Sequence, residues 1–164
     1  MVGFTGSRRP PASLAAAAEC VAVLVGSMGL PVGVGCASGI DAIIRETIGH
    51  ARLFEAAGAE PWQFAERSAA LVEACRHARG WDSLAAFPAS PCPAGLIPSH
   101  SWARCFNGSG SGTWATAAYA AGVGLPLVVF GSVELPEWGG VWEVVQWGPL
   151  AGGKVFRAGQ ICMF

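Results

Sequence analysis

The chain has 164 residues, of which 52% are apolar and only 13% are charged, a length and composition that fit one compact domain with its own core. Its formal net charge of −1 excludes a general electrostatic attraction to nucleic acid or to an anionic membrane. The apolar excess favours a sheet that is covered on both faces.

The first predicted unit is a strand followed by a turn and a helix. Val2–Thr5 is a short apolar run that is typical of a strand. The next run, Gly6 to Pro11, ends in two prolines, which exclude it from the interior of a strand or a helix. Ser13 is expected to cap the helix that follows, which extends to about Val25.

The same order of elements occurs again in the next part of the chain. Leu30–Val34 is predicted to be the second strand, and residues 35–39 form a second glycine-rich turn. Ile40–His50 has the apolar spacing of a helix, with Asp41 in its first turn. We expect Asp41 to complement the dipole of its own helix, or else to orient a ligand hydroxyl or a basic side chain.

Residues 51–107 are predicted to contain a third strand, a helix, a fourth strand and a long loop. Ala51–Glu55 is the expected strand, and Pro61–Arg79 reads as an amphipathic helix whose charged side chains, Arg67 among them, face solvent. Leu84–Phe87 is the expected fourth strand. A proline-rich loop then leads to Gly108, and loops of this length in compact domains are usually functional or poorly ordered.

The run from Gly108 to Thr113 opens a third unit of the same kind. Its three glycines let the backbone turn sharply and approach a ligand closely, and its hydroxyl groups can bind a ligand or cap a helix. The helix expected at Thr113–Ala121 is rich in alanine, which allows close packing on a sheet. Leu127–Phe130 is predicted to return as a buried parallel strand.

The chain changes character beyond Gly131, where Trp138, Trp142 and Trp147 alternate with glycines. This pattern predicts two or three short strands, with the tryptophans in the core or at a dimer interface. We therefore expect a Rossmann-like domain over residues 1–131, with residues 132–164 as a C-terminal β extension packed on it. The predicted fold class is α/β, a three-layer parallel sheet with helices on both faces and a small C-terminal β appendage.

The three glycine-rich turns are the candidate binding site. In repeated strand-turn-helix units the turns lie at the carboxyl edge of the sheet, where helix N-termini favour anions. Neighbouring strands would bring the turns to one crevice, and Arg8 and Arg9 would add donors for phosphate. The expected ligand-binding residues are Gly6, Ser7, Arg8, Ser38, Gly39, Asp41, Gly108, Ser109, Gly110, Ser111, Gly112 and Thr113.

Other familiar chemistries find little support in the sequence. The Gly108–Thr113 turn lacks the lysine of a phosphate-binding P-loop, and the chain contains no G-x-S-x-G nucleophile motif. Its six cysteines include no C-x-x-C pair, so we expect reduced thiols and no metal site. His100 lies alone in the proline-rich loop and is expected to have no chemical role.

Three of these runs together resemble the SLOG superfamily of Rossmann-like proteins: Gly6-Ser7-Arg8, Cys36-Ala37-Ser38-Gly39-Ile40-Asp41, and the run from Gly108 to Thr113. The resemblance covers about residues 2 to 130. The superfamily includes the DNA-processing (Smf-type) recombination mediators and the "lonely guy" or lysine-decarboxylase-like phosphoribohydrolases. The resemblance implies a nucleotide-type ligand at the turns.

The two branches of the superfamily imply different activities. The phosphoribohydrolases carry a catalytic glutamate in a P-G-G-x-G-T-x-x-E motif, and Thr116 stands at that place here, where it cannot act as an acid or base at neutral pH. The mediators bind single-stranded DNA through a basic pocket. The arginines that could form such a pocket here are Arg8, Arg9, Arg45, Arg67 and Arg104.

We therefore expect binding or sensing of a nucleotide or nucleotide-derived phosphate ligand, without catalysis and without a required cofactor. Two alternatives remain open. One is single-stranded DNA binding of the recombination-mediator type, and the other is phosphoribohydrolysis of a nucleoside monophosphate, for which Glu46 or Glu55 would have to reach the crevice. No membrane span is expected, because the apolar run before Gly26 is short and contains Glu19. A cytoplasmic homodimer is the expected form.

Overall fold

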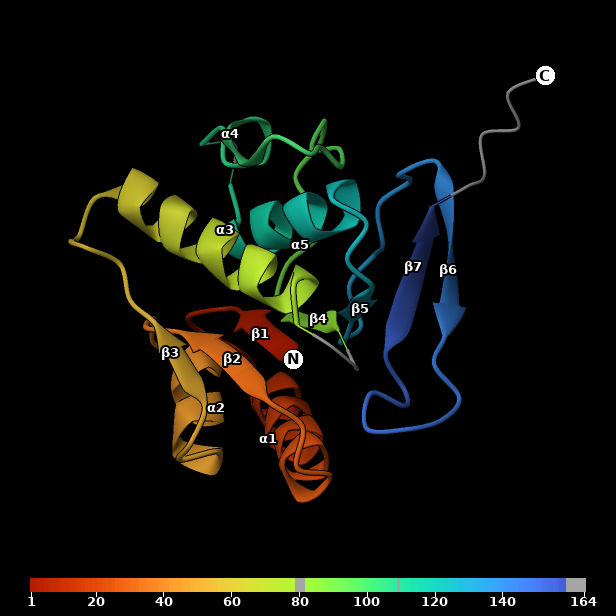
Figure 1. The fold of residues 1–164 in the computed structure, drawn as a ribbon. Coiled ribbons are helices and arrows are strands. Elements are labelled where there is room, and N and C mark those ends of the chain that lie inside the picture. Colours follow the sequence, from red (N-terminus) through yellow and green to blue (C-terminus); the bar gives the residue numbers. More distant parts are fainter. Residues whose placement is uncertain (79–81, 109, 159–164) are drawn as a thin grey trace.

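The computed structural model describes residues 1–78, 82–108 and 110–158. Within these residues, one seven-stranded sheet has the strand order β3-β2-β1-β4-β5-β7-β6 (Figure 1). The strands are β1 (Val2–Gly6), β2 (Val32–Gly35), β3 (Arg52–Phe54), β4 (Ser83–Phe87), β5 (Leu127–Val129), β6 (Gly140–Val144) and β7 (Lys154–Ala158).

Strands β1 to β5 are parallel, and the last two strands continue the same sheet in antiparallel pairing. Strand β1 pairs with β2 on one side and with β4 on the other. Strand β7 pairs antiparallel with β5, and β6 pairs antiparallel with β7. The C-terminal strands are therefore an extension of the main sheet, not a separate one.

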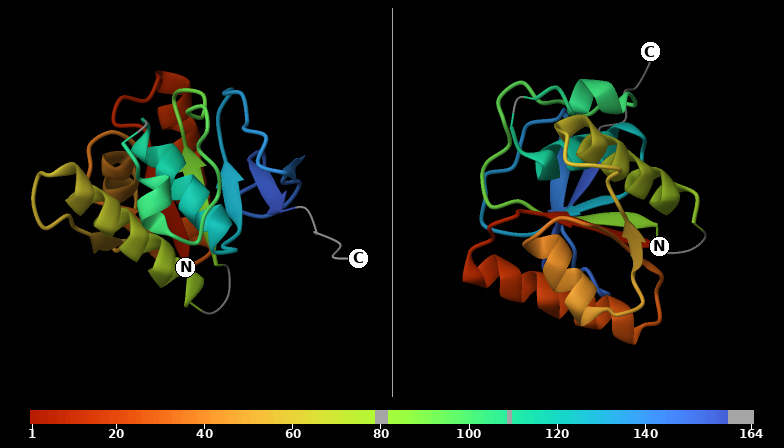
Figure 2. Two further views of the ribbon diagram at one scale, coloured as in Figure 1. Left: turned by 90° about the horizontal axis from the view of Figure 1, so that it is seen from above. Right: turned by 90° about the vertical axis from the view of Figure 1, so that its left-hand side faces the viewer.

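Helices cover both faces of the sheet. They are α1 (Ala12–Ser27), α2 (Ile40–Thr47), α3 (Pro61–Arg76), α4 (Trp102–Cys105) and α5 (Gly112–Gly122). The right-hand view of Figure 2 shows α1 and α2 on one face and α3 and α5 on the other, with α4 on the side of α3 and α5. The predicted α/β fold class, with a mostly parallel sheet between two helical layers, is confirmed.

Each face of the sheet has its own apolar core, and the period of two along a strand decides which core a side chain joins. In β4, Leu84 and Ala86 belong to the core beneath α3 and α5, whereas Ala85 and Phe87 belong to the core beneath α1 and α2. Phe87 stacks on the ring of Phe130 at a centroid distance of 4.8 Å. The unbroken apolar runs of the sequence therefore reflect burial on both sides.

Several helix boundaries differ from the sequence prediction for local reasons. Ser13 does not cap α1, because Pro11 takes the N-cap position and the helix begins at Ala12. Proline suits the start of a helix because it has no N–H to leave unsatisfied. The helix predicted to reach His50 ends at Thr47. The last residues predicted for α3 include Arg79, which lies outside the described residues.

The tryptophans of the tail divide into a packed group and an exposed one. Trp138 makes edge-to-face contacts with Trp114 at 5.9 Å and with Phe156 at 5.6 Å. Its indole N–H also donates to the carbonyl oxygen of Leu96 at 2.9 Å, which ties the tail to the proline-rich loop. Trp147, in contrast, is 85% exposed and does not pack in the core, so of the two predicted positions only a dimer interface remains for it, as a prediction.

Candidate functional site

The strand order places a reversal point between β1 and β4. The chain winds from β1 to β2 and β3 in one direction, and β4 then begins the other half of the sheet on the far side of β1. Ligands of open α/β sheets bind outside the carboxyl ends of the strands at such a point. Here the two carboxyl ends are joined by a hydrogen bond from the Ser7 N–H to the Phe87 carbonyl oxygen at 3.0 Å.

A cleft of about 770 Å³ lies at this reversal point. Its walls come from the turn after β1, the start of α2, the first half of α3, and the segment from α4 into α5. The predicted site residues that line it are Gly6, Ser7, Arg8, Asp41, Gly108, Gly110, Ser111, Gly112 and Thr113. A volume of this size is typical of sites for small molecules and cofactors.

Three predicted site residues are not placed on the cleft wall. Ser109 lies outside the described residues, and Ser38 is exposed and does not line the cleft. Gly39 has a φ of +73°, and a Cβ there would lie 2.3 Å from the Ser7 carbonyl oxygen. The next N–H, of Ile40, donates to that same oxygen at 3.0 Å. Gly39 therefore lets α2 approach the first turn closely.

A buried ion pair forms part of the cleft wall. The Asp41 carboxylate accepts hydrogen bonds from Arg67 Nη1 at 3.2 Å and from the Ala37 N–H at 3.3 Å. Burial raises the pKa of Asp41 above its ordinary value, and the positive charge of Arg67 opposes that rise. Asp41 and Arg67 both line the cleft, so a bound ligand would lie next to the ion pair.

The position of Arg67 differs from the one predicted from the sequence. It was expected to face solvent with the other charged residues of its helix, but its side chain is only 7% exposed. The reason is a tertiary contact with Asp41 of α2, which no pattern within the helix encodes. Within the described residues Arg67 Nε is buried without a hydrogen-bond partner, which leaves one donor unused beside the cleft.

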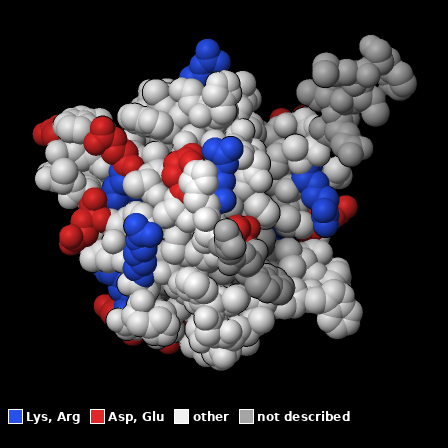
Figure 3. All heavy atoms as spheres, in the orientation of Figure 1, with Lys and Arg blue, Asp and Glu red and all other residues white. Residues whose placement is uncertain are grey.

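Arg45 is also engaged internally. Its Nη1 donates to the carbonyl oxygens of Gly35 at 2.6 Å and of Ala37 at 3.0 Å, and so fixes the turn between β2 and α2. Two of the five arginines that could have formed a DNA-binding pocket, Arg45 and Arg67, are thus committed to the fold. On the face shown in Figure 3, the basic side chains are interspersed with acidic ones and form no continuous patch.

The start of α5 supplies the third side of the cleft. The Ser111 hydroxyl oxygen caps the helix by accepting from the Trp114 N–H at 3.5 Å. Thr116, at the place of the phosphoribohydrolase glutamate, is buried on the cleft wall and donates to the Gly112 carbonyl oxygen at 2.8 Å. Among the described residues Asp41 is the one carboxylate on the wall, and neither Glu46 nor Glu55 reaches it.

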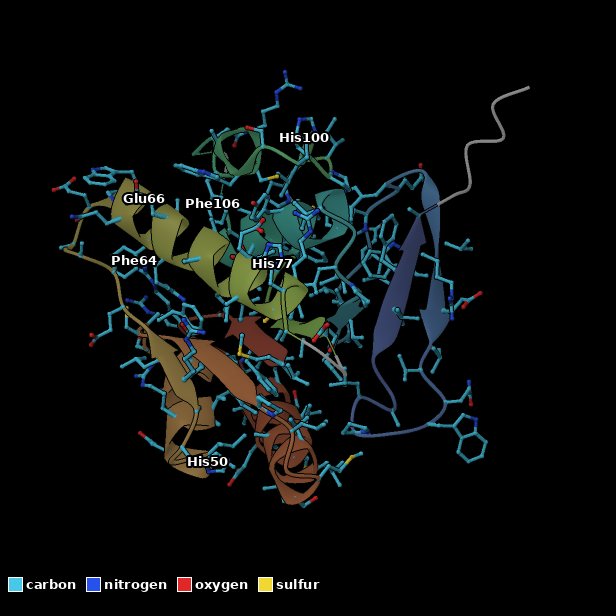
Figure 4. All side chains as sticks on the ribbon, in the orientation of Figure 1. His50, Phe64, Glu66, His77, His100 and Phe106 are labelled. Carbon is cyan, nitrogen blue, oxygen red and sulfur yellow. The ribbon has the colours of Figure 1, made fainter. Side chains whose placement is uncertain are left out.

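Four aromatic side chains that sequence reasoning did not assign to the site also line the cleft. Trp62 and Phe64 come from the first turn of α3, and Trp102 and Phe106 come from α4 and the residue after it. Figure 4 labels Phe64 and Phe106 on these two elements. The Arg8 guanidinium lies over the Phe64 ring, 4.8 Å from its centre, in a cation–π contact.

The described residues contain no group of three or more histidine, cysteine, aspartate or glutamate side chains that could hold a metal ion. The three histidines, His50, His77 and His100, lie far apart in Figure 4. A second hollow of about 840 Å³ lies at the amino ends of the strands, beside Met1 and Val32. Ligand sites of such sheets lie at the opposite edge, so we assign the site to the cleft at the carboxyl ends.

Across the part of the chain that the structure describes, no helix is both long and apolar enough to cross a membrane. Comparison of the chain with protein-family models, with curated proteins and with solved structures found no match. The function of the protein is therefore inferred from the geometry of the cleft.

Proposed function

We propose that the cleft binds a nucleotide or a nucleotide-derived phosphate ligand, and that the protein acts by binding or sensing it. The observation that carries the proposal is the meeting of residues from all three glycine-rich turns in one cleft at the reversal point of the sheet. A ligand that reached both the Gly6–Arg8 turn and the start of α5 would contact both halves of the fold.

The phosphate end of the ligand is assigned to the turn before α5 and to Arg8. The first N–H groups of a helix have no partner within the helix and point outward with partial positive charge, which favours a phosphate. Gly110, at a φ of +144°, belongs to this turn and lines the cleft. Arg8 can donate two parallel hydrogen bonds to phosphate oxygens.

Binding is favoured over hydrolysis because the described cleft wall offers no free acid–base pair. Asp41 is committed to Arg67, and Thr116 has no useful acidity at neutral pH. Binding of a small molecule is favoured over single-stranded DNA because Arg45 and Arg67 are used internally. The SLOG resemblance points to the same class of ligand and stays a prediction.

A thermal-shift screen of the purified protein against nucleoside monophosphates, diphosphates, cyclic nucleotides and short single-stranded DNA tests the proposal, with product analysis of each hit. Stabilisation by an intact nucleotide is the expected result. Release of free base would overturn it in favour of phosphoribohydrolysis. Stabilisation by DNA alone, lost as salt is added, would overturn it in favour of the recombination-mediator type.

A glycine variant and a matched control make the test specific to the cleft. Gly110→Val places a branched side chain at a positive φ, with its Cβ 3.0 Å from Pro93 Cγ, and should abolish nucleotide binding. Gly152→Val imposes the same kind of backbone strain at a φ of +83°, with no atom within 4 Å of its Cβ and far from the cleft. It should lose some stability and keep its affinity.

The expected homodimer also stays a prediction. Val23 and Leu24 of helix α1 and Met28 directly after it are exposed, and we propose that a subunit contact would form at these apolar side chains. Sedimentation velocity over a range of concentrations, with Leu24→Lys as the variant, would test it; a wild-type protein that stays monomeric would contradict it.

A further inference from the structure

The aromatic side chains of the cleft are more exposed than several of its polar side chains. Trp62 is 55% exposed and Trp102 is 36% exposed. The polar residues of the same cleft, Asp41, Arg67 and Thr116, are buried. Exposed aromatic rings and buried polar side chains therefore line the same cleft.

Three of the six tryptophans that the structure describes do not share the exposure of these rings. Trp114 is fully buried, and Trp138 and Trp142 pack against Phe156 in the tail. Burial of the whole indole is the usual outcome, because it removes a large apolar surface from water. Trp62 and Trp102 leave that surface exposed on the wall of the cleft that contains the glycine-rich turns.

We infer that the aromatic wall formed by Trp62, Phe64, Trp102 and Phe106 receives the flat heterocycle of a nucleobase. The inference rests on the proposed function and narrows it, since it makes the ligand a base-bearing nucleotide and excludes a simple sugar phosphate. The base stacks on this wall, and the phosphate extends to the turn that begins only two residues after Phe106.

The geometry of the rings leaves flat faces available for stacking. Trp102 and Phe106 meet at 63°, edge to face, with their ring centres 6.5 Å apart. Trp62 and Trp102 are exposed, so part of each indole surface is accessible to a third ring. Stacking of a base on an aromatic side chain needs no particular hydrogen-bond pattern, because every base has a flat π face. The wall thus fits nucleobases as a class.

Arg8 connects the aromatic wall with the phosphate end. Its guanidinium lies over Phe64, which restricts the long side chain before a ligand arrives. Arg8 and Phe64 both line the cleft. The positive charge of Arg8 is therefore adjacent to the aromatic wall. A nucleotide needs this arrangement, because a sugar joins its base to its phosphate.

Titration calorimetry with adenosine monophosphate and with ribose phosphate tests the inference. The wild-type protein should bind adenosine monophosphate more tightly than ribose phosphate. Trp102→Leu and Trp62→Leu should each weaken binding of adenosine monophosphate by about tenfold and leave ribose phosphate unchanged. Trp102→Phe keeps a ring and should retain most of the affinity. Trp147→Leu, at an exposed site away from the cleft, should change neither.

The two proposals fail in different ways. If ribose phosphate binds as tightly as the nucleotide, and the tryptophan variants alter neither affinity, the aromatic wall is not a base site while the phosphate site stands. If neither compound binds, the proposed function and this inference both fall. Thermal unfolding of each variant shows that it is folded, as expected for substitutions of exposed side chains.

Discussion

The guanidinium of Arg67 and the carboxylate of Asp41 meet over the carboxyl end of β2, at a distance of 3.2 Å. Asp41 belongs to α2 on one face of the sheet, and Arg67 belongs to α3 on the other. The pair passes over Gly35, where a Cβ would lie 1.5 Å from Arg67 Nη1 and 2.5 Å from Asp41 Oδ2. The missing side chain of Gly35 is what allows the two helical layers to be joined.

Gly35→Ala should therefore displace the ion pair and disturb the cleft. We expect a loss of about 2 kcal/mol in the free energy of unfolding, in the range of other overpacked sites, together with weaker nucleotide binding. Urea denaturation and calorimetry measure the two effects. Gly49→Ala is the matched control, because a Cβ there meets no atom within 4 Å, and its stability should stay within about 0.5 kcal/mol of wild type.

Removal of one partner of the buried pair should cost more than removal of both. Asp41→Asn leaves the Arg67 charge buried without a counterion, and we expect a loss of about 3 kcal/mol in unfolding free energy. The double variant Asp41→Asn, Arg67→Met removes that unpaired charge, so its loss should be smaller than the sum of the single losses. Additive losses in urea denaturation would show that the two side chains act independently.

The pH dependence of stability offers a separate test of the same pair. The pKa of Asp41 is raised by burial above 3.8, and Arg67→Met removes the positive charge that opposes the rise. A group whose pKa is higher in the folded state than in the unfolded state stabilises the fold below the unfolded pKa, and this stabilisation is lost as pH rises through the folded pKa. The Arg67→Met variant should therefore lose more stability at neutral pH than at acidic pH, relative to wild type.

Adding Asp41→Asn to Arg67→Met should remove that extra pH dependence, since no carboxyl group then remains at the site to titrate. Denaturation curves collected from acidic to neutral pH give the comparison. An unchanged pH slope in the double variant would place the titrating group elsewhere.

Tyr119 is the single tyrosine of the chain, so its ionisation can be followed directly by absorbance. Burial raises its pKa to about 12, and its hydroxyl adds to the rise by donating to Glu73 Oε1 at 2.6 Å. The folded protein should titrate near that value, and protein unfolded in urea should titrate near 10. The stabilising contribution is present below the unfolded value and lost as pH rises through about 12. A native midpoint near 10 would contradict the contact.

The cysteines should differ strongly in their reactivity toward an alkylating reagent. Burial raises the pKa of Cys75 to about 12, and its side chain is fully enclosed, so it should react only after unfolding. Cys20 is exposed on α1 and should be modified in the native protein. Peptide mass spectrometry after brief alkylation, with and without urea, measures both. Rapid native labelling of Cys75 would indicate that α3 opens away from the sheet.

The order of elements and the position of the turns could be predicted because they depend on local signals. Strands such as Val2–Gly6 and Ser83–Phe87 are short apolar runs, and a glycine-containing turn follows the first while the proline-rich loop follows the second. The pairing of β7 with β5 was not predictable, because it depends on which sheet edge was left open once five strands had assembled. The observed start of α1 and the observed end of α2 differ from the predicted ones, because local backbone contacts set these boundaries.

The cleft was only partly predictable, because some of its residues are placed by local signals and others by contacts between distant parts of the chain. Glycine turns are visible in sequence, but the burial of Arg67 depends on a partner 26 residues away. The aromatic wall had a weak local signal in Trp102 and Phe106, which are four residues apart and so share one side of a helical turn. Trp62 follows Pro61 at the start of α3, and nothing in its neighbours reveals that this end of the helix borders the cleft.

The antiparallel strands β7 and β6 cover the edge that β5 would otherwise present to solvent. Strand β5 is buried throughout, and β7 pairs with its outer side. A chain cut after residue 131 would expose the backbone groups of β5 as a template for strand addition by any neighbouring molecule. It would also release the loop segment that Trp138 holds at Leu96, on the same wall that leads to Trp102. The tail thus covers the outer side of β5 and contacts, through Trp138, a loop residue that lines the cleft.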